Sequence, residues 1–312
     1  MTTDRAALND RYPRPARIAP AEWAARVQLA AAYRIFVQLG WQEMIYNPLS
    51  LRVPDEPGHF LLNPFGLHYS EVCASNLVKV DVRGNTVGHS DWPINPAGFT
   101  FHGAIHEALA DAHCVMHMHT TATMAVCCLE DGLALSNFYA AQLHGQLAHH
   151  DFEGITVHLD EGRRILASAS GKKVLLLRNH GPVIIGVSLA HAFGLMWLLQ
   201  RACEVQLAAQ PLGRLRAITT PVLEGCVRDS LNFNPSFGAG QDVFDAMQRL
   251  VDRVDPSCRG RLEADWGLSG GRCGCSPRRV PWPGGLHRSA GGRRRVKGPV
   301  CSGRAVHTAL RW

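Results

Sequence analysis

The chain has 312 residues, 46% of them hydrophobic, which is enough to bury a sizeable core. It contains no run of about twenty apolar residues and starts with the polar stretch MTTDRAALND, so we expect a cytoplasmic protein with neither a membrane span nor a secretory signal. The net charge is +6, but residues 267–312 hold ten Lys or Arg and no acidic residue, which leaves −4 on residues 1–266. The body therefore gives no electrostatic reason to expect nucleic-acid binding, whose usual footprint is a basic face.

Helical and strand patterns alternate along most of the chain. The first helix is predicted from Pro20 to Gly40, because apolar residues recur at helical spacing between a proline suited to a first turn and a glycine suited to a helix end. The later elements are predicted as short strands at 59–66 and 77–85, a helix at 99–112, a strand at 114–119, a short strand at 155–159, a buried strand at 172–181, and helices at 188–210 and 241–254.

This alternation without an internal repeat predicts one α/β domain. We expect an N-terminal extension at 1–19, the domain at 20–258 and a basic, low-complexity tail at 259–312. From Gly267 onward the tail is rich in Gly, Arg and Pro, so it is predicted to be disordered, or to be a reading frame translated out of phase. Its cysteines lack the paired spacing of a zinc site, and the cysteines of the body are predicted to be buried free thiols.

The stretch HCVMHMHT contains the pair His117 and His119. Residues two apart on a strand face the same side, so both imidazoles could bind one ion. His180, which ends a strand and precedes a glycine, is the candidate third ligand, and three nitrogen ligands would leave a coordination position open for substrate or water.

Packed core histidines are the alternative, because the chain has 16 histidines and an isolated pair with this spacing arises often by chance. His102 and His106, four apart on a helix, could form a ligand pair, but we favour packing there. His144, His149 and His150 are predicted to be surface or supporting groups.

Four blocks in order resemble the class II aldolase/adducin head-domain family, over roughly residues 20–258. They are IYNPLSLRVPDEPGHFLLNPFGLHYSEVCASNLVKVD, INPAGFTFHGAIHEALADAHCVMHMHT, HHDFEGI and LLLRNHGPVIIGVSLAHAFGLMWLLQRACEVQLAAQ. The resemblance is greatest to the adducin-like branch, through NPFGLHYSEV and ASNLVKVD. It implies a single three-layer α/β/α domain whose central, largely antiparallel β-sheet is flanked by helices.

In catalytic members, which include fuculose-phosphate aldolase, the resemblance implies that His117, His119 and His180 hold a divalent metal. Zinc is expected first, with Mn²⁺ and Fe²⁺ as alternatives. Such an ion acts as a Lewis acid on the hydroxyl and carbonyl oxygens of a small substrate. The resemblance also implies a homo-oligomer, commonly a tetramer.

The sequence departs from the aldolases at the position of their acid/base glutamate, where it has Gly98. A positioned carboxylate is typically worth ~10²- to 10⁴-fold in rate, so its loss is significant. The family serines that bind substrate phosphate fall on Pro96 and Ala97, which have no hydroxyl group. We therefore expect a substrate without a phosphate.

Nearby residues are the candidate proton donors in place of that glutamate. Tyr139 is the candidate catalytic acid, with Glu107, His144 and His150 as further candidates, and packing or solvent exposure is the alternative for each. The loops that match the family's substrate side supply the candidate substrate-binding residues Asn47, Ser50, Asn63 and Gly66.

Three functions remain open. The first is a metal-dependent lyase of the aldolase or decarboxylase kind, acting on a small oxygenated substrate. The second is a non-haem Fe(II) oxygenase or decarboxylase of aromatic hydroxy acids. The third is a non-catalytic, adducin-like cytoskeletal binding module. The three histidines argue against the third, because a scaffold has no physical need for neutral ligands at this spacing.

Overall fold

A seven-stranded sheet lies at the centre of the chain. The computed structural model describes residues 5–156, 158–230, 236 and 238–260. Within these residues the strand order is β3-β2-β1-β4-β7-β6-β5, and neighbouring strands are antiparallel except for the parallel pair β5 and β6. The strands are β1 (Leu49–Arg52), β2 (His59–Leu62), β3 (Val78–Asp81), β4 (Cys114–His117), β5 (Leu147–His150), β6 (Val174–Leu177) and β7 (Gly181–Gly186).

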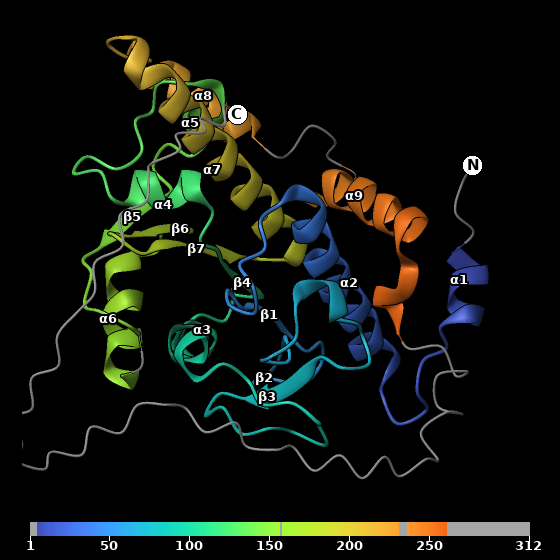
Figure 1. Cartoon of the computed structure of the whole chain (residues 1–312). Helices are drawn as coiled ribbons and strands as arrows, with labels where there is room; N and C mark the ends of the chain where they lie inside the picture. The colour runs from blue at the N-terminus through green and yellow to red at the C-terminus, as the bar shows by residue number, and fades with distance from the viewer. Residues whose placement is uncertain (1–4, 157, 231–235, 237, 261–312) are drawn as a thin grey trace, which may run out of the picture. The chain divides into compact units, whose positions relative to one another are not determined.

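Helices cover both faces of this sheet (Figure 1). One face is covered by α3 (Pro96–Ala108) and α6 (Leu159–Ala169), and the other by α2 (Pro20–Leu39), α7 (Leu189–Ala209) and the helices packed on them. The remaining helices are α1 (Arg5–Arg11), α4 (Thr121–Cys127), α5 (Phe138–Ala141), α8 (Thr220–Asp229) and α9 (Gln241–Val254). The predicted three-layer α/β/α fold with a largely antiparallel sheet is confirmed.

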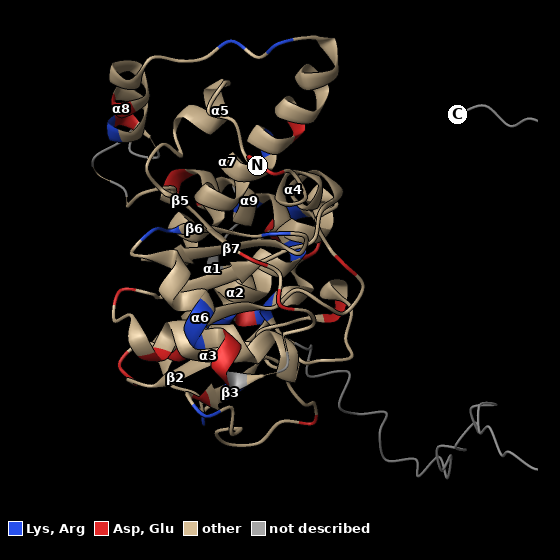
Figure 2. Ribbon diagram, turned by 90° about the vertical axis from the view of Figure 1, so that its left-hand side faces the viewer, with Lys and Arg blue, Asp and Glu red and all other residues tan. Residues whose placement is uncertain are grey.

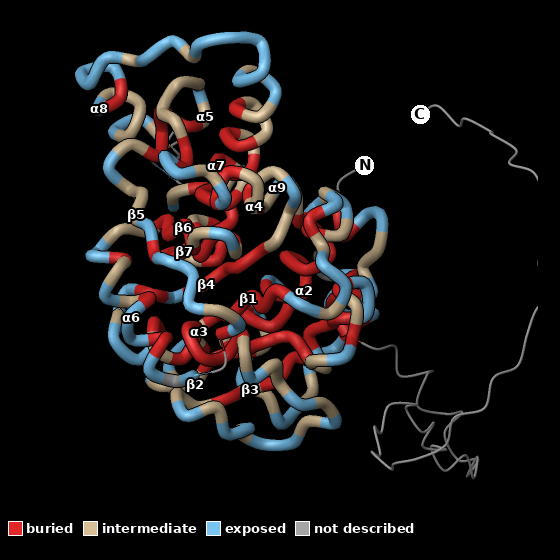
Figure 3. Tube along the Cα trace, turned by 60° about the vertical axis from the view of Figure 1, so that its left-hand side comes forward, coloured by how far each residue is buried: buried red, intermediate tan, exposed pale blue. Residues whose placement is uncertain are grey.

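Successive side chains along a strand point to opposite faces of the sheet, which explains the two apolar layers. Cys114 and Met116 of β4 join the core under α2 and α7, whereas Val115 between them joins the core under α3 and α6. Leu176 and Leu177 of β6 divide between the two cores in the same way. Because the central strands bury both faces, their sequences read as continuous apolar runs, and Figure 3 shows the buried trace concentrated along them.

Local signals position the helix ends. Pro20 opens α2, and Gly40 ends it in the left-handed conformation with φ +70°. Asn95 caps α3 by accepting a hydrogen bond from Ala97 N–H, and Ser188 caps α7 by accepting one from His191 N–H. The first turn of α3 borders the candidate site.

Several predicted elements are wrong in detail. The strand predicted at 155–159 is not formed, because residues 155 and 156 lie in a bend and α6 begins at Leu159. The strand predicted at 114–119 ends at His117, and the one predicted at 172–181 ends at Leu177, where a turn leads into β7. Strands β1, β5 and β7 and helices α1, α4, α5, α6 and α8 were not predicted, and most of them are only four to seven residues long.

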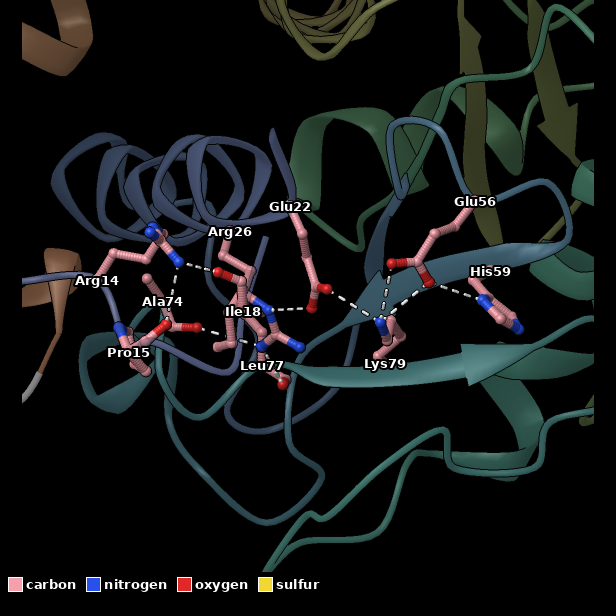
Figure 4. A network of polar contacts seen from close by, with 10 residues as sticks. All are labelled: Arg14, Pro15, Ile18, Glu22, Arg26, Glu56, His59, Ala74, Leu77 and Lys79. Carbon is pink, nitrogen blue, oxygen red and sulfur yellow. Dashed lines mark hydrogen bonds and ion pairs between the residues drawn. The ribbon is translucent and has the colours of Figure 1, made fainter. Parts of the chain in front are cut away.

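A buried ionic network joins α2 to the edge of the sheet (Figure 4). Arg26 Nε lies 2.7 Å from Glu22 Oε1, and Arg26 Nη1 donates to the carbonyls of Ala74 and Leu77 at 3.2 and 2.7 Å. Lys79 Nζ lies 2.9 Å from the other oxygen of Glu22. Both Glu22 and Arg26 are buried, so their charges depend on these partners.

The charged residues, the helix hydropathy and the cysteines of the described residues bear on the remaining expectations. Figure 2 shows basic and acidic residues interspersed along the ribbon. No described helix has both the length and the apolar content to cross a bilayer. Five of the body's cysteines are buried free thiols, as predicted, whereas Cys128 is exposed and Cys226 is half-buried. From residue 261 onward, the predicted tail lies outside the described residues.

Candidate metal centre

Three segments bring His117, His119 and His180 together. His117 is the last residue of β4, His119 lies two residues later in the loop before α4, and His180 lies in the turn between β6 and β7. The antiparallel pairing of β4 with β7 places His117 opposite Val183, which brings the turn that holds His180 to the end of β4. The fold therefore brings His180 next to two histidines that lie more than sixty positions earlier in the sequence.

The three rings face one another closely. Their centroids are 4.5 Å apart for His117 and His119, 4.9 Å for His117 and His180, and 5.0 Å for His119 and His180. One ring nitrogen from each lies within 4.8 Å of the others, and the Nε2 atoms of His117 and His119 are 2.7 Å apart. Among the described residues, this is the one cluster of three or more potential ligand side chains.

Hydrogen bonding fixes the tautomer of His117. Its Nδ1 lies 2.8 Å from the carbonyl oxygen of Pro182, and a carbonyl can only accept, so Nδ1 carries the proton and Nε2 presents a lone pair. Such a bond to the second ring nitrogen is the usual way in which a protein orients a metal-binding imidazole. The donor set therefore fits a divalent cation.

Burial keeps these imidazoles neutral. It lowers the pKa of His117 well below its usual value, with further lowering from His119 and His180. Burial also lowers the pKa of His119, and burial together with His119 lowers the pKa of His180 to about 4. A metal ligand must be the neutral imidazole, so protons compete weakly for these nitrogens at neutral pH.

The turn that holds His180 needs its glycine. Gly181 has φ +156°, and a Cβ there would lie 2.6 Å from the carbonyl oxygen of Met118 and 3.0 Å from Cδ2 of His119. Asn179, just before His180, has φ +57°, a conformation that asparagine tolerates better than most residues. The close approach of β7 to the His119 loop thus depends on the sequence Asn-His-Gly.

A cavity of about 260 Å³ opens beside the histidines. It is lined by His117, His180, Asn47, Pro48, Asn95, Ala97, Gly98, Phe101, Met124, Phe152, Gly154, Ile155, Thr156 and Asn179. Most of the wall is apolar, and no Lys, Arg, Asp, Glu or Tyr is among these described lining residues.

Asn47 is the most unusual polar group in the wall. It is 2% exposed and has φ +64°, and neither side-chain amide atom has a hydrogen-bond partner. A buried amide without partners costs free energy, typically about 1–3 kcal/mol. A ligand with both donor and acceptor groups would satisfy it, which fits the expectation that Asn47 contacts substrate.

The other candidate substrate-binding residues lie away from the cavity lining. Ser50 is buried between the side chains of His102 and His106. Asn63 Oδ1 lies 3.0 Å from the hydroxyl group of Tyr33. Gly66, with φ +106°, lies in a turn beside the Trp92 ring. Ser50 and Asn63 thus have partners within the fold, and their role in substrate binding stays a prediction.

Tyr139, the candidate acid, lies on α5 outside the cavity of its own chain. Its ring packs against Trp197 at 5.4 Å between centroids, and the guanidinium of Arg201 lies 5.6 Å from its ring centroid. Its catalytic role stays a prediction. Phe152 and Thr156 also line the cavity and were not predicted from the sequence, although the HHDFEGI block that leads into this loop belongs to the resemblance.

The packing interpretation of His102 and His106 agrees with the structure. Ser50 Oγ lies 2.6 Å from His102 Nδ1 and 2.7 Å from His106 Nε2, and His106 Nδ1 lies 2.9 Å from the carbonyl oxygen of Ala112. Burial lowers the pKa of His106 to about 3 and that of His102 well below its usual value. Both are therefore neutral in the folded chain near pH 7.

We expect these buried histidines to make the chain sensitive to acid. Their pKa is lower in the folded than in the unfolded chain, so the unfolded chain binds more protons below pH 6.5 and the free energy of unfolding falls as pH falls. The expected loss is about 2 kcal/mol at pH 5 for each such histidine. Urea unfolding with a chelator present, between pH 7 and pH 5, measures this slope. His106→Gln should flatten the slope and exposed His113→Gln should not; equal slopes in all three would contradict the assignment.

The chain is similar to known proteins in both sequence and structure. Residues 27–207 match the family described as the class II aldolase and adducin N-terminal domain. A Caulobacter vibrioides protein, provisionally named as a class 2 aldolase, is 43% identical over 77% of this chain and 93% of its own length. Rat α-adducin is 39% identical over 73% of this chain, which spans 33% of α-adducin. The structure of L-fuculose 1-phosphate aldolase from Glaciozyma antarctica superimposes with a TM-score of 0.69 at 26% identity, over 82% of this chain and 99% of that one.

Proposed function

Because the chain belongs to the class II aldolase and adducin family, we propose that it is a divalent-metal-dependent carbon–carbon lyase acting on a small, non-phosphorylated substrate. The observation that carries this proposal is the convergence of His117, His119 and His180 beside a cavity that also contains the unpartnered amide of Asn47. Ligands for a cation and an unsatisfied buried amide in one cavity favour a reactive site over a scaffold.

The charge and the space of the cavity wall support a substrate without a phosphate group. No cationic side chain is among the described residues that line the cavity, and a phosphate dianion is usually paired with Arg or Lys. Pro96 and Ala97, at the first turn of α3, offer no hydroxyl group. A Cβ at Gly98 would lie 2.5 Å from Cγ of Pro48, so the wall has no room there for a glutamate unless Pro48 moves.

The bound cation would supply Lewis acidity toward adjacent hydroxyl and carbonyl or carboxylate oxygens of the substrate. His117, held by the Pro182 carbonyl, would keep its Nε2 oriented for that ion. Asn47 would hydrogen-bond the substrate and fix its orientation. Phe101 and Met124 in the wall would exclude water from the reacting bond.

Zinc is the first expectation for the ion, with manganese and iron as alternatives, since three imidazoles accept each of them. An iron-bound chain would favour oxygenase or decarboxylase chemistry on aromatic hydroxy acids. A chain that binds no metal would favour an adducin-like interaction module. A homo-oligomer, a cytoplasmic location and a domain at 20–258 remain predictions.

We expect the metal-loaded chain to cleave erythrulose, a four-carbon ketose without phosphate, into formaldehyde and dihydroxyacetone. The measurement is formaldehyde release from the reconstituted full chain, compared with the chelated chain. Asn47→Ala should raise KM by about tenfold, the effect of losing roughly 1.4 kcal/mol of binding. Erythrulose 1-phosphate, which keeps the C4 hydroxyl group that the cleavage requires, should be cleaved no faster than erythrulose.

A second substrate separates the alternatives. Oxygen consumption with 3,4-dihydroxybenzoate would indicate the oxygenase, and carbon dioxide release without oxygen would indicate the decarboxylase. A metal-loaded chain that converts neither compound would overturn the proposed enzyme function. Preference for the phosphorylated ketose would overturn the proposed substrate class.

A further inference from the structure

A hydroxyl group and a buried carboxylate form a hydrogen-bonded pair in the cavity wall. Thr156 is the one hydroxyl-bearing residue among the described lining residues. Its Oγ1 donates to Oε1 of Glu161 at 3.0 Å, and each residue is only 4% exposed. Glu161 itself does not line the cavity, so the cavity reaches this carboxylate through Thr156.

The fold holds this pair rigidly behind the wall. Glu161 lies in the first turn of α6, where the positive end of the helix dipole favours a carboxylate. The next residue, Gly162, packs so closely on α3 that a Cβ there would lie 2.6 Å from the carbonyl oxygen of Thr100. The first turn of α3 lines the same cavity, through Ala97 and Gly98. The two helices therefore fix Glu161 at the cavity wall.

No ion pair joins Glu161 to any described residue. The nearby charged groups on α6 and on the loop before it pair with each other on the exposed side, where Arg164 bonds Glu153 and Asp160. On the α3 side, the groups nearest Gly162 are the Thr100 carbonyl and the Ala104 methyl. The one described side-chain partner of this buried carboxylate is a hydroxyl group, so its burial lowers the stability of the fold. That cost points to a functional role for Glu161.

We propose that Thr156 and Glu161 form a proton relay that serves the cavity, with Thr156 touching the substrate and Glu161 acting through it. This rests on the proposed lyase function. The other titratable groups in the lining are His117 and His180, which are proposed ligands, and the Asn side chains do not titrate. Among the described residues that line the cavity, Thr156 is therefore the one with a route to a proton acceptor.

The relay moves one proton in two linked transfers. The substrate hydroxyl next to the bond to be broken gives its proton to Thr156 Oγ1, while Thr156 gives its own proton to Glu161 Oε1. The carbon–carbon bond then breaks, the hydroxyl-bearing fragment leaves as an aldehyde, and the electron pair stays on the ketone fragment. The reverse transfers return the proton to that fragment, so Glu161 ends as it began.

The test uses Glu161→Gln, which keeps an oxygen to accept the Thr156 hydrogen bond but cannot take a proton. With erythrulose as probe, we expect kcat to fall about 10²- to 10⁴-fold with little change in KM. Thr156→Val should give a similar fall in kcat. Thr156→Ser keeps the hydroxyl group and should therefore keep most of the wild-type kcat. The double variant should be no slower than either single variant, because one relay is broken once.

Asp160→Asn is the matched control, because Asp160 lies on the same helical turn but is exposed and paired with Arg164. It should keep the wild-type rate. All variants should keep the metal content and melting temperature of the wild type to within a few degrees.

The outcomes separate the two proposals. A wild type that cleaves erythrulose, with Glu161→Gln equal to it in kcat, overturns the relay and leaves the lyase intact. A fall in rate that follows a loss of metal or of melting temperature assigns the pair a structural role and also overturns the relay. A metal-loaded wild type that does not cleave erythrulose removes the lyase and the relay together.

Discussion

Replacing any one of His117, His119 and His180 by alanine is expected to reduce bound metal from about one per chain to below about a tenth. The reason is the donor set, because two remaining imidazoles hold a divalent ion much more weakly than three. Their lowered pKa keeps all three nitrogens available at pH 7, so the wild type should load readily. Plasma mass spectrometry of the anaerobically purified full chain measures the metal content.

His113→Ala is the matched control for this experiment. His113 lies immediately before β4, only four residues from His117, but it is exposed and outside the cluster. It should keep full metal content. A saturating metal should also raise the melting temperature of the wild type and of His113→Ala, since a ligand at about 100 times its Kd stabilises by about 2.7 kcal/mol. Unchanged metal in the three variants would show that the ion binds elsewhere.

The identity of the ion decides among the functions. Zinc or manganese would favour the lyase, and iron would favour oxygen chemistry. A folded wild type that takes up no metal on reconstitution would favour the adducin-like module. This experiment needs no substrate, so it can be interpreted before any activity is known.

Arg26→Met is expected to lower the free energy of unfolding by about 3–5 kcal/mol. The substitution roughly keeps the volume but leaves the buried Glu22 with Lys79 as its one cation and removes the donor to the Ala74 and Leu77 carbonyls. The network in Figure 4 links α2 to the segment before β3, so its loss should loosen that edge of the sheet.

Urea unfolding followed by circular dichroism, with a chelator present, measures this loss. Arg228→Met is the control, because Arg228 is exposed and its pair with Asp229 is a surface contact. Its effect should stay below about 1 kcal/mol. If Arg26→Met proved equally mild, the buried network would be less important for stability than its burial suggests.

The helices with strong end signals could be predicted from sequence. The Pro20 start and Gly40 end of α2 and the Ser188 cap of α7 are local features, and local features are visible in sequence. The strand predicted at 155–159 was wrong, because Ile155 and Thr156 line the cavity and Leu159 begins α6. Short strands of four residues carry too little period to be recognised reliably.

The candidate metal residues were identified by residue type and resemblance, but the geometric reason given for them was partly wrong. His119 does not share the strand with His117, since β4 ends at His117 and the loop turns His119 toward it. Only the fold brings in the turn with His180, through the antiparallel pairing of β4 and β7. Sequence spacing carries no record of such long-range pairing.

The sequence by itself determined the family, the alternation of helices and strands, and the loss of the carboxylate and hydroxyl groups at 96–98, because these depend on residue identity and local pattern. The tertiary structure alone decided that Asn47 is buried without partners in the cavity wall, that Ser50 and Asn63 have structural partners, and that Thr156 connects the cavity to Glu161. The physical reason is that burial and hydrogen-bond satisfaction are properties of what packs around a residue, and those neighbours come from distant parts of the chain.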